Sequence, residues 1–258
     1  MPQFSIQVLK VGEMPEVPSC GVRAMQDLGK WEAFCYTMLV ARAEGLTVVV
    51  NTGFPDDVSR PRRFWQDWQP RCVLHRPDEM RVERQLKRIG VNPDEVDHLI
   101  INPLGPYSTG KIELFTKATI HIGRTEWIDF QAPPPGFPSQ PRDVILPPHI
   151  ERWLFENWSR VRLLEDEDEV CPGVRVFSVG AHHKGSLAVA FSTARGTVIY
   201  TDAMFTYENF ENNVPIGFCR NVDEFHLAVQ RLRKQADILL PAFDVKLFDR
   251  HRDGVVVP

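Results

Sequence analysis

The chain has 258 residues, with 30 Lys and Arg against 34 Asp and Glu, and 43% of its residues are hydrophobic. These values are typical of a soluble globular protein with a sizeable core, and they exclude a disordered chain. The formal net charge of −4 provides no basic footprint for nucleic acid. No apolar run approaches the ~18 residues of a membrane span, and no signal peptide is expected. We therefore expect neither a nucleic-acid partner nor a membrane.

The cysteines indicate a compartment. The chain has five of them, unevenly spaced and without a C-x-x-C pair. An odd number of cysteines without framework spacing is typical of a reducing environment. We therefore expect a cytoplasmic protein.

The predicted elements alternate between strands and helices. Runs rich in β-forming residues at 34–41 and 46–50 flank Glu44-Gly45, which is typical of a hairpin. Apolar residues at helical spacing predict a helix over 78–89. The remaining elements are expected as strands at 99–101, 118–122, 174–179, 187–191, 197–200 and 238–240, and helices at 149–158 and 223–235. This order predicts an α/β fold with mixed sheets, organised as a single domain over 1–258.

Prolines cluster at 133–141, where five of the 21 prolines lie. Strongly patterned segments stand on both sides of this stretch. We therefore expect a surface loop that is ordered or partly mobile, rather than a domain linker. Its role at any functional site is not assigned.

Several segments, taken in chain order, match one known family. The strand at 48–50 leads into Asn51-Thr52-Gly53, and 120–127 ends in an Arg-x-Glu-aromatic pattern. Thr201-Asp202-Ala203 precedes a run from Tyr207 to Pro215. The other matching segments are 96–101, 110–115 and 179–186. The chain resembles the metallo-β-lactamase superfamily, and in particular its N-acyl homoserine lactonase branch.

The resemblance implies a fold and a chemistry. The implied fold is a metallo-β-lactamase-type αββα sandwich with two mixed β-sheets. The family holds two metal ions, usually zinc, with a His-x-His-x-Asp-His loop, a later His, a bridging Asp and a final His. Such a pair of ions activates water and stabilises the developing oxyanion.

The metal-binding pattern of the family is incomplete in this sequence. His182 and Asp202 stand at two of the ligand positions. The other ligand positions hold residues that have no ligand atom or bind zinc poorly. These residues are Pro103, Gly105, Tyr107, Ser108 and Phe243. We therefore expect no dinuclear centre, no bound metal and no cofactor. A single weakly held ion, completed by His183 or Tyr107, is the alternative.

The retained pair suggests metal-free chemistry. His182 is the candidate acid/base, and Asp202 is the carboxylate that orients it. Ser108 is a candidate nucleophile, because the ligand positions that these residues inherit lie close together in the family. Tyr107 is an alternative hydrogen-bond donor to a substrate carbonyl, or a residue that fills vacated volume. Small residues also fill space when ligands are lost, which is the structural alternative for Ser108.

Other residues are assigned to substrate binding or to structure. The residues assigned to substrate binding are expected to line the ancestral cleft. They are His183, Lys184, Tyr207 and Phe243. His98 and His121 lie on or beside strands outside the motif, and we expect them to be structural.

We predict a divergent, metal-independent enzyme that acts on a small lactone, ester or other carbonyl compound. The first alternative is a non-catalytic pseudoenzyme that binds a small ligand or a protein partner in the old cleft. The second alternative is a conventional metal-dependent lactonase. The expected partner is a small molecule. The sequence leaves the substrate and the oligomeric state open, with a homodimer among the options.

Overall fold

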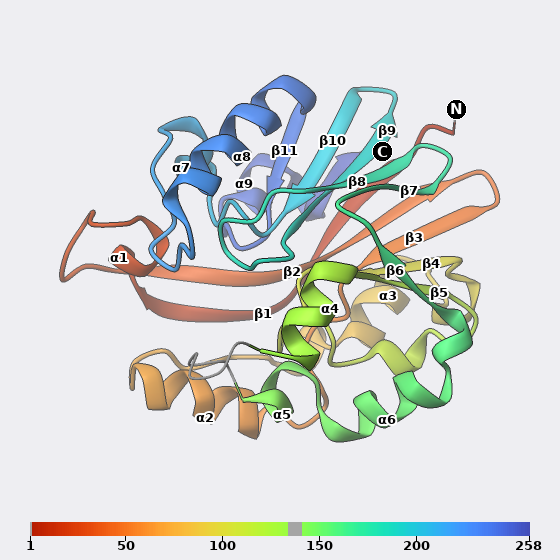
Figure 1. Ribbon diagram of the computed structural model, residues 1–258, viewed down its shortest axis with the longest axis horizontal. Coiled ribbons are helices and arrows are strands. Elements are labelled where there is room, and N and C mark those ends of the chain that lie inside the picture. The colour runs from red at the N-terminus through yellow and green to blue at the C-terminus, as the bar shows by residue number, and fades with distance from the viewer. Residues whose placement is uncertain (1, 134–140) are drawn as a thin grey trace.

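Two β-sheets packed face to face form the centre of the molecule, and helices cover their outer sides (Figure 1). The computed structural model describes residues 2–133 and 141–258. The prediction of a surface loop at 133–141 falls mostly on residues outside those ranges. Among the described residues, no helix combines the length and apolarity needed to cross a bilayer.

The first sheet has seven strands. In spatial order they are β12 (Val255–Val257), β1 (Ser5–Pro18), β2 (Trp31–Ala43), β3 (Leu46–Val50), β4 (His98–Ile101), β5 (Thr119–Gly123) and β6 (Val161–Leu164). Strands β3 to β6 run parallel, and β12 to β3 pair antiparallel. The sheet is therefore mixed, as predicted.

The second sheet has five strands and is also mixed. Its order is β11 (Ile238–Pro241), β10 (Gly196–Thr201), β9 (Leu187–Thr193), β8 (Val174–Ser178) and β7 (Glu167–Cys171). Only β10 and β11 pair in parallel. Together the two sheets confirm the predicted α/β sandwich.

The helices lie on the two outer faces (Figure 1). Beside the larger sheet lie α2 (Ser59–Trp68), α3 (Val82–Arg88), α4 (Arg124–Gln131), α5 (Arg142–Ile145) and α6 (Pro148–Glu156). Beside the smaller sheet lie α7 (Tyr207–Glu211), α8 (Val222–Gln235) and α9 (Leu247–Arg250), and the short α1 (Ser19–Val22) follows β1. Asn221 caps α8, since its side chain accepts hydrogen bonds from two backbone N–H groups of the first turn.

The predicted elements differ from the structure in several places. The helix expected over 78–89 is a 3₁₀ turn, Asp78–Met80, followed by α3, because Arg81 between them has extended backbone angles. The long strand β1 was not predicted, because Gly12 and Pro15 resemble strand breakers. The register between β1 and β2 shifts beside both residues, which accommodates them within the strand.

One side chain fastens the two sheets together near the site. Asn102 follows β4, and its amide donates to the carbonyl of Leu187 on β9 at 2.7 Å and accepts from the Leu187 N–H at 2.8 Å. The Asn102 N–H donates in turn to the side chain of Asn51, after β3. The ends of β3, β4 and β9 are thereby held at one edge, where the loops that carry the candidate residues begin.

Candidate active site

A cavity of about 320 Å³ opens at this edge of the sandwich. Its wall is built mainly from aromatic and aliphatic side chains, among them Phe34, Phe64, Trp65, Trp68, Phe205 and Phe218. Tyr107, His182, His183 and Phe243 also line it. An apolar cavity with a few convergent polar groups is the usual form of a small-molecule site.

The two histidines lie in the loop between β8 and β9. The loop turns at Gly180, whose φ of +56° is a left-handed conformation that favours glycine. A Cβ at this position would lie 2.4 Å from a carboxylate oxygen of Glu224 on α8. The same carboxylate accepts a hydrogen bond from the N–H of Ala181, so α8 holds the start of the loop.

The end of the loop packs against α4. Gly185 approaches Glu126 so closely that a Cβ would lie 2.5 Å from the Glu126 backbone nitrogen. The Gly185 N–H donates to Glu126 Oε2 at 3.0 Å, and Glu126 Oε1 lies 3.5 Å from His183 Nδ1. A buried carboxylate on α4 therefore orients the His183 ring.

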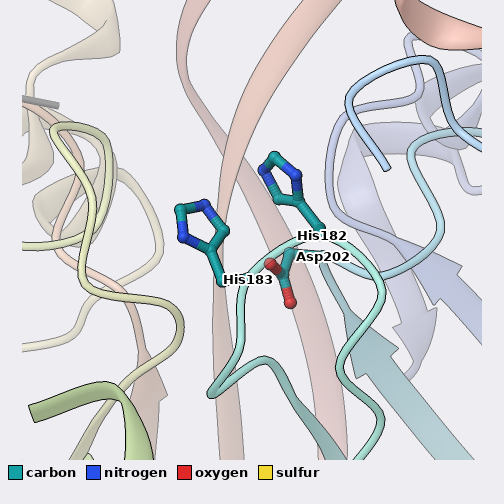
Figure 2. Close-up of side chains that lie close together, drawn as sticks. All are labelled: His182, His183 and Asp202. Atoms are coloured by element: carbon teal, nitrogen blue, oxygen red, sulfur yellow. The ribbon is translucent and has the colours of Figure 1, made fainter. Parts of the chain in front are cut away.

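Asp202 follows β10 and is fully buried beneath the histidines. The Ser186 hydroxyl donates to Asp202 Oδ2 at 2.8 Å and accepts from the His183 N–H at 3.0 Å. Figure 2 shows both imidazole rings above this carboxylate. Oδ1 of Asp202 has no hydrogen-bond partner among the described residues. One donor atom from each of His182, His183 and Asp202 lies within 4.8 Å of the others.

The electrostatics of the three groups differ. Burial raises the pKa of Asp202 to about 6 and lowers the pKa of His182 well below its usual value, so His182 is neutral at pH 7. Burial also lowers the pKa of His183, but the Glu126 carboxylate outweighs it and the net shift is upward. The two neighbouring imidazoles thus have opposite tendencies to carry a proton.

Tyr107 also lines the cavity and packs among aromatic residues. Its ring stacks on Tyr36 at 5.2 Å between centroids and meets Phe243 edge-on. Burial holds the pKa of the phenol far above its usual value. The hydroxyl is buried and has no partner in the part of the chain that the structure describes. Tyr107 is therefore a neutral hydrogen-bond donor.

Comparisons with known proteins agree on one family. A scan against protein-family models finds no match. An N-acyl homoserine lactonase of a Bacillus species is 27% identical over 233 residues, which cover 86% of this chain and 81% of the lactonase. A Bacillus thuringiensis lactonase is 29% identical over 191 residues, covering 71% and 68% of the two chains. The chain is therefore similar in sequence to N-acyl homoserine lactonases.

Solved structures share the fold over at least nine-tenths of the chain. An N-acyl homoserine lactone hydrolase with N-hexanoyl-L-homoserine bound at its catalytic metal centre superposes with a TM-score of 0.79. It is 21% identical, and the match covers 98% of both chains. A probable metal-dependent hydrolase from Staphylococcus aureus gives a TM-score of 0.74 at 13% identity, covering 94% of this chain and 90% of the other. The lactonase-like branch is the part of the superfamily that the chain resembles.

The Ser108 hydroxyl, the candidate nucleophile, has its hydrogen-bond partners within its own loop. It donates to the carbonyls of Pro103 and Gly105 and accepts from the Gly105 N–H. The ring of His182 is bonded elsewhere, with Nδ1 3.3 Å from the carbonyl oxygen of Phe218. The Ser108 hydroxyl is therefore satisfied within its own loop, and the His182 ring is held by the segment that precedes α8. This geometry favours a structural role for Ser108 and does not support the expected Ser-His pair.

The other predicted residues separate into two groups. His183 and Phe243 line the cavity with His182 and Tyr107. Lys184 instead points toward solvent, 3.9 Å from Asp129. Tyr207 lies at the start of α7, where its ring packs under Arg250. Neither Lys184 nor Tyr207 is among the residues that line the cavity.

Sequence reasoning did not single out Glu126 and Ser186 as site residues. Glu126 belongs to the Arg-x-Glu-aromatic pattern that supported the resemblance, and Ser186 closes the segment 179–186 that contains both histidines. Both patterns marked the family, but no pattern in the sequence connects Glu126 to a histidine 57 positions later. The connection depends on the close approach of Gly185 to α4.

Proposed function

We propose that this protein is a hydrolase of small lactones or esters with an apolar chain, acting in the aromatic cavity without the dinuclear metal centre of the lactonases it resembles. The observation that carries this proposal is an apolar cavity with Tyr107, His182 and His183 at its floor. The lactonase relatives and the shared fold support the hydrolase class.

The loss of the dinuclear centre is supported by the residues at the other ligand positions. Pro103 and Gly105 have no side-chain donor atoms, and the Ser108 hydroxyl is engaged by its own backbone. Phe243 packs as an aromatic wall against Phe34 and Tyr107. The residues present therefore do not fit two ions. This loss does not by itself make the reaction metal-free, because three donors of the cleft remain together.

Hydrolysis requires two polar functions, and the floor of the cavity offers both. The carbonyl oxygen must be stabilised as it becomes negative, and the neutral Tyr107 hydroxyl is a buried donor without a partner. The attacking water must be activated, and His182, His183 and Asp202 stand together for this purpose. The aromatic wall holds the apolar part of the substrate.

The test is turnover on a panel of N-hexanoyl- and N-decanoyl-L-homoserine lactones and phenyl esters of matched chain length, followed by proton release. Trp68 and Phe218 meet at 4.9 Å between ring centroids and are 46% and 39% exposed. We expect Trp68→Ser to lower kcat/KM for the decanoyl substrate about tenfold, as lost apolar contact predicts. Phe155→Ser, at an exposed aromatic residue of α6, is the matched control and leaves kcat/KM unchanged.

Two outcomes would contradict the proposal. An absence of turnover on every lactone and ester, with these compounds still binding to the cavity, would favour the non-catalytic ligand-binding alternative. Equal effects of Trp68→Ser and Phe155→Ser would place the substrate outside the cavity.

A further inference from the structure

His182, His183 and Asp202 each have one polar atom engaged by a neighbouring residue. Nδ1 of His182 lies 3.3 Å from the carbonyl oxygen of Phe218, and Nδ1 of His183 lies 3.5 Å from Glu126 Oε1. Oδ2 of Asp202 accepts from Ser186. An imidazole that donates through Nδ1 keeps its lone pair on Nε2. The lone pairs left for a ligand are therefore Nε2 of both histidines and Oδ1 of Asp202.

We infer that His182, His183 and Asp202 form a mononuclear binding site for one divalent transition-metal ion, with zinc as the ion that the donor set suits best. One possible ligand atom of each residue lies within 4.8 Å of those of the other two. Ligands of a tetrahedral ion with bonds of about 2.1 Å are separated by about 3.4 Å. Small rotations of the two rings, which lie edge to face above Asp202 (Figure 2), would close this difference.

A second and independent observation points to a ligand. Asp202 is completely buried, and its Oδ1 has no hydrogen-bond partner in residues 2–133 and 141–258. A buried carboxylate oxygen without a partner is costly, so it indicates a group that completes the site. The partners on the outer sides match the pattern around metal ligands, in which a carboxylate or carbonyl orients each imidazole.

The donor set also selects the class and number of ions. Two imidazoles and one carboxylate suit zinc and related transition metals, whereas magnesium and calcium prefer oxygen ligands. Within the described ranges this is the one group of three or more such side chains close enough to hold an ion. Three protein ligands with an open position are typical of a catalytic zinc site, and such an ion supplies Lewis-acid activation of water.

The chain's own residues then have distinct roles. Glu126 and Ser186 are positioning residues, because they act on His183 and Asp202 rather than on the ion. Tyr107 is not a ligand in this arrangement and remains free to donate to a substrate oxygen. The inference goes beyond the proposed function, since it concerns binding of an ion and does not depend on turnover.

The experiment measures metal content and affinity in the full chain. The protein is stripped with chelator, reloaded with zinc, and assayed by elemental analysis, with cobalt as a spectroscopic probe of coordination. We expect one zinc per chain and a tetrahedral cobalt spectrum. His183→Ala and Asp202→Asn should weaken zinc binding at least about 100-fold, and Glu126→Gln about tenfold.

The matched control is His226→Ala, which removes a histidine bonded only to Asn213 among the contacts of its ring nitrogens and should leave zinc affinity unchanged. Circular dichroism confirms that each variant is folded, and Asp202→Asn and Glu126→Gln keep the side-chain volume. Absence of zinc, two zinc ions per chain, or an equal loss in His226→Ala would overturn the inference. Turnover by a protein that binds no zinc would overturn the inference and preserve the proposed function. Zinc bound without turnover supports the inference and contradicts the proposed function.

Discussion

The molecule contains two pairs of adjoining histidines, and they differ in how their nitrogens are satisfied. His98 and His121 lie side by side on β4 and β5, and Nδ1 of His98 is 3.0 Å from Nε2 of His121. His182 and His183 lie in a loop with ring centroids 4.2 Å apart. Their Nδ1 atoms face groups on other segments, Phe218 and Glu126.

The difference distinguishes a packing pair from the pair that we propose to be functional. The first pair bonds to itself within a sheet, and burial lowers the pKa of both rings, that of His121 to about 3. The second pair stands beside Asp202 at a cavity. Histidines alone therefore do not mark a site. What marks it is the convergence of unpaired donors with a carboxylate that orients them.

The largest expected effect comes from the same substitution in each pair. His183→Leu should lower kcat on the proposed substrates about a thousandfold, because it removes a group that activates water. His121→Leu should leave kcat at pH 7 within about threefold, because His121 lies outside the cavity lining. Steady-state kinetics on both folded variants makes the comparison, and similar losses in the two would erase the distinction.

A smaller effect is expected at the hydroxyl of Tyr107. Tyr107→Phe should lower kcat/KM about 100-fold, as removal of one oxyanion donor does. It should not lower the melting temperature, because the buried hydroxyl has no partner to lose among the described residues. The control is Tyr200→Phe, which removes a hydroxyl bonded to Thr37. Tyr200→Phe should cost about 1 kcal/mol of stability and leave kcat/KM unchanged, whereas the reverse result would reject the role of Tyr107.

The burial of His121 leads to a prediction about how the stability of the protein depends on pH. His121 has a folded-state pKa of about 3, below the unfolded value of about 6.5. The unfolded chain therefore binds the extra proton first, and stability contributed by neutral His121 is lost as the pH falls below about 6.5. Between pH 7 and pH 5, His121→Leu should lose about 2 kcal/mol less unfolding free energy than wild type. Urea titrations at both pH values test this, and parallel pH curves would contradict it.

The smallest expected effects concern two buried serines. Ser186→Ala should reduce kcat about tenfold, because Ser186 positions Asp202 and the His183 backbone. Ser108→Ala should reduce stability by about 1–2 kcal/mol, because the Gly105 N–H loses its partner. It should leave the activity of the folded protein within about twofold. A large loss of activity in Ser108→Ala at wild-type stability would restore the nucleophile hypothesis.

The sequence predicts the fold where apolar runs and turn residues agree. The predictions at 46–50 and 187–191 agree with β3 and with most of β9, because both segments contain runs of buried apolar residues. Strand β1 was not predicted. It accommodates Gly12 and Pro15 only because its pairing with β2 shifts register beside these residues. Local composition carries no information about such pairing.

The site is partly predictable for the same reason. His182 and Asp202 were found through motif positions at the ends of strands, and Tyr107 and Phe243 through the residues they replace. The partnership of His183 with Glu126 depends on how closely the loop approaches α4, which only the three-dimensional packing determines. The hydrogen bonds that occupy the Ser108 hydroxyl are likewise invisible in a motif.

The Asn102 amide joins β4 to β9 and so links the two sheets beside the candidate site. Asn102 is not one of the three donors His182, His183 and Asp202. We therefore expect that these donors can be exchanged without altering the spacing of the two sheets at this edge. A histidine introduced at Gly105 would press on Tyr107, since a Cβ there would lie 3.2 Å from the Tyr107 ring. The two positions are therefore coupled, and a donor introduced at Gly105 also changes the surroundings of Tyr107.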